Sequence, residues 1–131
     1  MKRPRRVFLS YADSDRPLAA TLAKDLNAAG FTVWSDYEVL PGDNWARKVA
    51  KALEESDAMV VIVSPAAGKS ERVHREVEFA LGSRRYADRL IPVVVKPTRD
   101  MAWILDELDP VSVKKVKGKV SRHVIEALQE R

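Results

Sequence analysis

One stretch near the middle of the chain, residues 59–82, most constrains the fold. It opens with an uninterrupted apolar run at residues 59–63, rich in β-branched side chains, which is typical of a strand buried on both faces. The pair Ser64-Pro65 ends this run, and Ser70 offers an N-cap for a following helix. That helix has one apolar face, formed by Val73, Val77, Ala80 and Leu81. A buried strand followed by an amphipathic helix predicts an α/β fold.

Glu76, on this predicted helix, is the first candidate for a functional residue. At about 100° per residue it falls at the border between the apolar and the solvent face, one turn after Arg72. A carboxylate near the carboxyl end of a buried strand lies where open α/β sheets place a ligand crevice. The same position also suits a structural glutamate paired with Arg72 or Arg75. The pattern alone leaves both roles open.

The rest of the chain alternates strand and helix signals. Strands are expected at residues 6–10, 31–34, 59–63, 90–95 and 111–116. A first helix is expected after Ser14 or Asp15, with Leu18, Leu22 and Leu26 on one face. A second is expected after Asp43 or Asn44, with Trp45, Val49, Ala52 and Leu53 facing inward. Three more are expected at residues 70–82, 99–108 and 119–130. Pro92 lacks a backbone donor, so it is expected at a strand start or toward a sheet edge. This alternation predicts an α/β flavodoxin-like five-stranded parallel sheet, order 2-1-3-4-5, with helices on both faces.

Length and composition exclude several classes of protein. The 131 residues suit one domain spanning the whole chain, and without cysteine there is no disulfide framework or thiolate metal site. Two histidines are too few for a metal cluster, so no metal is expected. The apolar runs have strand length and the N-terminus lacks the apolar core of a signal peptide, which favours a cytoplasmic protein with no membrane association.

The net charge of +4 comes largely from two basic clusters, at residues 2–6 and 114–119. No aromatic residues interleave with these clusters, which favours solvated termini over a nucleic-acid site. The five glycines do not follow G-x-G-x-x-G spacing, so a dinucleotide held as a redox cofactor is not expected.

Five motifs in order support a family resemblance. They are VFLSY at residues 7–11 followed by acidic residues, GFTVWSD at 30–36, LPGD at 40–43, VIVSP at 61–65, and Ser70 with VHRE at 73–76. Together they resemble a TIR domain, the fold of Toll and interleukin receptors, and more closely its bacterial type. A phosphate-accepting response regulator would need an aspartate where Ser64-Pro65 stands. A nucleoside-transferring enzyme also uses a glutamate on a related fold, and the motif order argues against it less decisively.

The resemblance implies two alternative functions. Many bacterial, plant and axonal TIR domains cleave NAD+ between nicotinamide and ribose, sometimes cyclising the remainder, whereas others only self-associate or dock on adaptor proteins. For this chain the first alternative is an NAD+ glycohydrolase in bacterial defence or signalling, with NAD+ as substrate and no cofactor. The second is a non-catalytic TIR–TIR interaction module, with the 36–45 loop as the self-association surface.

By resemblance, the catalytic glutamate corresponds to Glu76. One carboxylate is sufficient for this chemistry, because nicotinamide leaves a pyridinium as a neutral base and needs no proton, and an ionised carboxylate stabilises the oxocarbenium-like ribose. The resemblance assigns Ser10, Tyr11 and Ala12 to the nicotinamide half of the substrate. Ser70 and Leu40, the latter in the loop that TIR domains use to gate the substrate, are also assigned to the substrate site. Two further candidates stay open: Trp34 suits a ring-stacking or a core position equally well, and Asp36 suits either a ribose hydroxyl or a cap for the loop.

One departure from the family pattern concerns Arg72. NAD+-cleaving relatives often carry an aromatic residue four positions before the glutamate, and this chain has Arg72 there. An arginine plane can stack on adenine, or it can pair with Glu76 and quench it.

Overall fold

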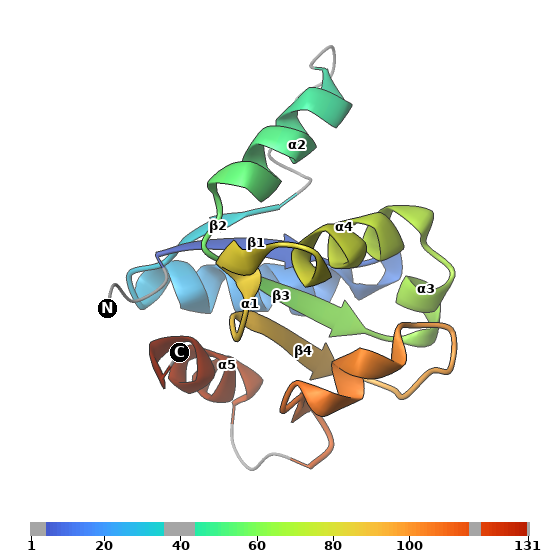
Figure 1. Cartoon of the computed structure of the whole chain (residues 1–131). Coiled ribbons are helices and arrows are strands. Elements are labelled where there is room, and N and C mark those ends of the chain that lie inside the picture. The colour runs from blue at the N-terminus through green and yellow to red at the C-terminus, as the bar shows by residue number, and fades with distance from the viewer. Residues whose placement is uncertain (1–4, 36–43, 116–118, 131) are drawn as a thin grey trace.

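The computed structural model describes residues 5–35, 44–115 and 119–130. Its centre is one five-stranded sheet, and Figure 1 shows the sheet between the helices. The strands are β1 (Arg6–Ser10), β2 (Thr32–Trp34), β3 (Ala58–Val63), β4 (Leu90–Val94) and β5 (Val111–Ser112). They pair in parallel in the order β2-β1-β3-β4-β5. The predicted fold class and strand order are confirmed.

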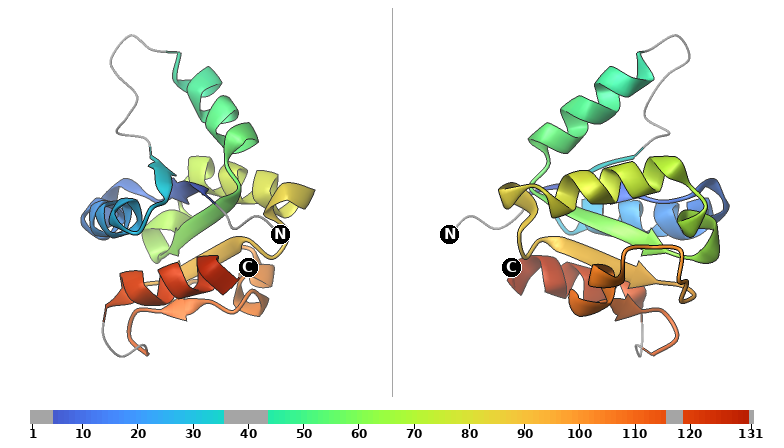
Figure 2. Two further views of the ribbon diagram at one scale, coloured as in Figure 1. Left: turned by 90° about the vertical axis from the view of Figure 1, so that its left-hand side faces the viewer. Right: turned by 45° about the vertical axis from the view of Figure 1, so that its right-hand side comes forward.

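Helices cover both faces of the sheet. The α-helices are α1 (Arg16–Ala28), α2 (Trp45–Glu55), α3 (Pro65–Gly68), α4 (Glu71–Leu81) and α5 (Val120–Glu130); the short 3-10 helices are η1 (Asp13–Asp15), η3 (Arg84–Tyr86) and η4 (Trp103–Glu107). Side chains of α1 and α5 fill one core layer, and those of α2, α3 and α4 fill the other. In Figure 2 the first turns of α2 project away from the sheet, in keeping with the exposure of residues 44–48.

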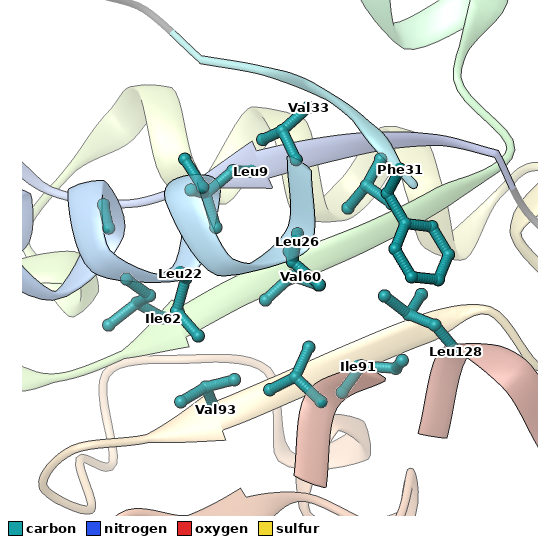
Figure 3. Close-up of a cluster of buried hydrophobic side chains, with 14 of the residues drawn as sticks. Leu9, Leu22, Leu26, Phe31, Val33, Val60, Ile62, Ile91, Val93 and Leu128 are labelled. Atoms are coloured by element: carbon teal, nitrogen blue, oxygen red, sulfur yellow. The ribbon is translucent and has the colours of Figure 1, made fainter. Parts of the chain in front are cut away.

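The central strand β3 supplies both core layers. Val60 and Ile62 point to the layer of α1 and α5, drawn in Figure 3, whereas Met59 and Val61 point to the opposite layer. All six residues of β3 are buried. The prediction of a strand buried on both faces is therefore confirmed, because an uninterrupted apolar run is stable only where neither face meets water.

Several local predictions differ from the structure. Ser64-Pro65 does not simply break the chain: Ser64 Oγ accepts from the backbone N–H of Ala67 at 3.1 Å and begins α3, whose four residues are too few to show a periodicity. Trp45 and Leu81 are exposed rather than in the core, because each lies at an end of its helix. The last strand ends at Ser112, well before the predicted residue 116.

Pro92 is the third residue of β4, paired with Val61, so the expectation that it starts a strand is wrong. The pairing of β4 with β5 begins only at Val93, opposite Val111. Among the described pairings, β4 at Pro92 has a neighbouring strand on one side only, namely β3. Pro92 is tolerated inside the sheet because its missing N–H leaves no hydrogen bond to a second strand unmade.

Tyr86 ties η3 to α2 and gives a prediction about pH. Its hydroxyl donates to the carbonyl of Leu53 at 2.5 Å, and burial raises the pKa of Tyr86 to about 12. The folded state thus keeps the phenol proton to higher pH than the unfolded chain, so this stabilisation is complete below about pH 10 and is lost as the pH rises toward 12. Between these values the unfolding free energy of the parent is expected to fall by roughly 2 kcal/mol more than that of Tyr86→Phe. Urea unfolding across this pH range measures both slopes, and equal slopes would contradict the assignment.

Candidate active site

Glu76 is buried, with 2% of its surface exposed, although its helical angle predicts a border position. Glu76 is buried rather than at the border because the end of β1 packs against this side of α4. Glu76 Oε1 accepts a hydrogen bond from Ser10 Oγ at 2.7 Å and lies 3.5 Å from Arg72 Nη1. The neighbours of this oxygen are therefore a hydroxyl donor and a guanidinium group.

The end of β1 provides two consecutive groups to this site. Ser10 is fully buried and directs its side chain to Glu76, whereas the carbonyl of Tyr11 accepts from Arg72 Nη2 at 2.6 Å. The Tyr11 side chain packs in the layer of α1 and α5, on the other face of the sheet. Because side chains alternate between the two faces here, the Ser10 side chain reaches Glu76, whereas Tyr11 offers only its backbone carbonyl, to Arg72.

The two arginines considered as partners of Glu76 differ in environment. Arg72 forms the ion pair, and its side chain is only 20% exposed. Arg75 instead lies 3.9 Å from Glu71, and that pair is almost fully solvated. The Arg72–Glu76 pair therefore differs from an ordinary surface salt bridge, since a buried carboxylate must be held by its neighbours.

A groove with a volume of about 480 Å³ runs between α2 and α4, and Glu76 lines it. Its size is within the range of small-molecule sites. The other lining residues are Trp45, Ala46, Val49, Ala50, Leu53, Glu71, Arg72, Arg75 and Phe79. The groove thus combines apolar walls with two guanidinium groups and one buried carboxylate.

Two aromatic residues of this groove, Trp45 and Phe79, were not predicted as site residues. They are 43% and 41% exposed and belong to facing helices. Phe79 follows Glu76 by three residues, and residues at this spacing are neighbours on a helix surface, so the sequence contains one indication that Phe79 lies near Glu76. Trp45 carries none, because the approach of α2 to α4 is a tertiary contact.

The remaining predicted site residues lie in several places. Trp34 stacks on Phe8, with ring centroids 4.8 Å apart, and lines a different hollow, so its position fits the core alternative. Ser70 caps α4 by accepting from Val73 N–H at 3.2 Å. Ala12 is buried just beyond β1. Asp36 and Leu40, and with them most of the 36–45 loop, are outside the described residues.

Within residues 5–35, 44–115 and 119–130, no three potential metal-binding side chains of the His, Cys, Asp and Glu types gather in one place. Across the same ranges, no helix combines the length and the apolar character needed to cross a membrane.

Comparisons with known proteins were made by sequence and by structure. The chain is 33% identical over 101 residues to the NAD(+) hydrolase PdTIR of Paracoccus denitrificans, which covers 74% of this chain and 33% of that protein. It is 27% identical over 126 residues to the 2' cyclic ADP-D-ribose synthase BtTIR of Bacteroides thetaiotaomicron, covering 94% of this chain and 43% of that one. The chain therefore spans less than half the length of either relative.

Among solved structures, the TIR domain of the Toll-related receptor TRR-2 from Hydra magnipapillata has the same fold. The TM-score is 0.77 at 22% identity, over 93% of this chain and 96% of that domain. The sequence also matches the TIR domain family over residues 7–125, nearly its whole length. The order of the strands, the helices on both faces and this match lead to one conclusion: the chain belongs to the TIR domain family.

Proposed function

We propose that this TIR domain cleaves NAD+ at the bond between nicotinamide and ribose, with Glu76 as the catalytic residue. The observation that carries the proposal is the buried carboxylate of Glu76, held by Ser10 and lining a groove of substrate size. The names of the two bacterial relatives, an NAD(+) hydrolase and a cyclic ADP-ribose synthase, support the same reaction.

The proposed reaction needs one carboxylate and no added cofactor. The bond between the pyridinium nitrogen and ribose C1′ breaks, and its electron pair goes to the nitrogen, so nicotinamide leaves as a neutral molecule. The Glu76 carboxylate stabilises the positive charge that develops on the ribose. Water then adds to C1′ and loses a proton, giving ADP-ribose; addition of a nucleophile of the same substrate molecule instead gives a cyclic product.

The groove offers complementary groups to the rest of NAD+. Arg75 is largely exposed in the groove and is suited to the pyrophosphate. Trp45 presents a half-exposed indole, and Trp is the side chain that best attracts a cationic ring such as the nicotinamide of NAD+. Ser10 is proposed to act indirectly, by holding Glu76. Asp36 and Leu40 are proposed as substrate-binding residues on the family resemblance alone.

The test is nicotinamide release from NAD+ by the purified protein at high concentration, with and without a crowding agent. Release of nicotinamide is expected, and chromatography of the second product distinguishes ADP-ribose from a cyclic form. No release under either condition, from protein that sediments as assemblies, would reject the proposal.

The second candidate function is a TIR–TIR interaction module without catalysis. The observation favouring it is the Arg72–Glu76 ion pair, since a carboxylate paired in this way can have a purely structural role. Under either proposal, the protein is expected to self-associate through the 36–45 loop. It is also expected to act in the cytoplasm, in bacterial defence or signalling.

Trp45→Ala is expected to raise KM for NAD+ about tenfold with little change in kcat. The reason is that the indole packs on the nicotinamide ring both before and during bond cleavage, so its loss removes binding that the bound substrate and the transition state share. Steady-state kinetics separates the two constants. The matched control is Trp103→Ala, which removes a tryptophan that is 73% exposed on η4 and lies outside the groove. An unchanged KM in Trp45→Ala would remove Trp45 from the site.

A further inference from the structure

One guanidinium nitrogen of Arg72 contacts the main chain and the other approaches a carboxylate. Its Nη2 donates to the carbonyl oxygen of Tyr11 at 2.6 Å, whereas its Nη1 is 3.5 Å from Glu76 Oε1. The guanidinium group is planar and its donors have fixed directions. Anchoring one nitrogen at the end of β1 therefore fixes the direction in which the other nitrogen points.

Two contacts connect the end of β1 with α4. Ser10 is the last residue of β1 and Tyr11 follows it directly, whereas Glu76 and Arg72 are one turn apart on α4. The Ser10 hydroxyl holds the Glu76 carboxylate, and the Tyr11 carbonyl holds the arginine that approaches the same oxygen. The carboxylate is thus located from two sides, which limits the torsional freedom of a long side chain.

We propose that Arg72 is a positioning residue, which fixes the Glu76 carboxylate against the end of β1 and does not itself contact the substrate. The inference rests on the proposed function, since positioning has a catalytic meaning only if Glu76 acts on NAD+. Small displacements of a catalytic group cost large factors in rate, so the expected effect of losing Arg72 is on kcat.

The alternative roles of Arg72 fit the geometry less well. A quenching salt bridge would be short, whereas Arg72 Nη1 lies 3.5 Å from Glu76 Oε1. A stacking role would need an accessible guanidinium plane. Arg72 is 20% exposed and anchored to Tyr11, whereas Arg75, 79% exposed on the same groove, is the guanidinium that a substrate meets first.

The test compares Arg72→Met and Arg72→Lys in steady-state cleavage of NAD+. Arg72→Met is expected to lower kcat about 10- to 100-fold with KM within about threefold of the parent. Arg72→Lys keeps the cation but cannot span both partners, so it should recover part of the lost kcat. The matched control is Arg122→Met, which breaks an exposed i,i+4 pair with Glu126 on α5 and should leave both constants unchanged.

Each contrary outcome has a distinct meaning. A raised KM with kcat preserved in Arg72→Met would make Arg72 a substrate contact, and a raised kcat would make it a quenching partner; either result overturns the positioning role. Kinetics equal to the parent would do the same.

A second measurement does not depend on activity. Ser10→Ala and Arg72→Met act on the same carboxylate, so the double variant is expected to lose less unfolding free energy than the sum of the two single variants. Additive losses would show that the two contacts do not act together. If the parent releases no nicotinamide, the proposed function fails and the catalytic role of Arg72 fails with it, whatever the unfolding free energies of the single and double variants show.

Discussion

Replacing Glu76 with glutamine is expected to lower kcat for nicotinamide release by about 10²- to 10³-fold while the protein stays folded. Glutamine has the same shape and can still accept from the Ser10 hydroxyl, which now donates to Glu76 Oε1 at 2.7 Å. What it removes is the negative charge, and preorganised charge facing a developing cation is worth factors of this size. Parallel measurements of kcat and of the urea midpoint separate chemistry from folding.

The matched control for this variant is Glu78→Gln. Glu78 lies on the same helix as Glu76, is exposed and does not line the groove. Its substitution removes one charge from α4 without touching the site, so kcat is expected to stay within about twofold of the parent, as for most surface substitutions. A Glu76→Gln variant that keeps the parental kcat would contradict the catalytic role, as would an equal loss in both variants.

Ile62→Ala is expected to destabilise the protein by about 2–5 kcal/mol. Ile62 is fully buried in the middle of the sheet, in the layer packed by α1 and α5 (Figure 3). The truncation removes apolar contacts and leaves a cavity that close-packed neighbours cannot fill. A loss of this size is a large part of the 5–15 kcal/mol typical of a domain.

Equilibrium urea unfolding measures this loss. Leu81→Ala, at the exposed end of α4, is the control and should cost no more than about 1 kcal/mol. Equal small losses in the two variants would mean that Ile62 does not belong to a packed core.

The fold was predictable because its main signals are local. The apolar run of β3 and the spacing of apolar residues on α4 each specify an element within a dozen residues. The alternation of strands and helices then leaves few topologies, because parallel strands need right-handed crossovers. Short elements were less predictable: four residues of α3 carry too little periodicity to be distinguished from a loop.

The environment of Glu76 was not predictable in the same way. Helical periodicity gives the angle of a residue on its helix but not what covers it, and Ser10, which donates a hydrogen bond to the carboxylate, is 66 positions away. The same reason applies to Trp45, whose place in the groove depends on how α2 meets α4. Sequence patterns thus identified the central carboxylate, and only the tertiary contacts revealed how it is held.

The most direct test of the proposed site uses the three tryptophans as reporters. NAD+ is added to the Glu76→Gln protein, and the indole N–H signals of Trp34, Trp45 and Trp103 are followed by NMR. Trp45 lines the groove, Trp34 stacks on Phe8 and lines another hollow, and Trp103 lies on η4. The proposed site predicts a saturable shift of the Trp45 signal, with little change in the signal of Trp103. A saturable shift confined to Trp34 or Trp103 would place NAD+ outside the groove and contradict the role given to Glu76.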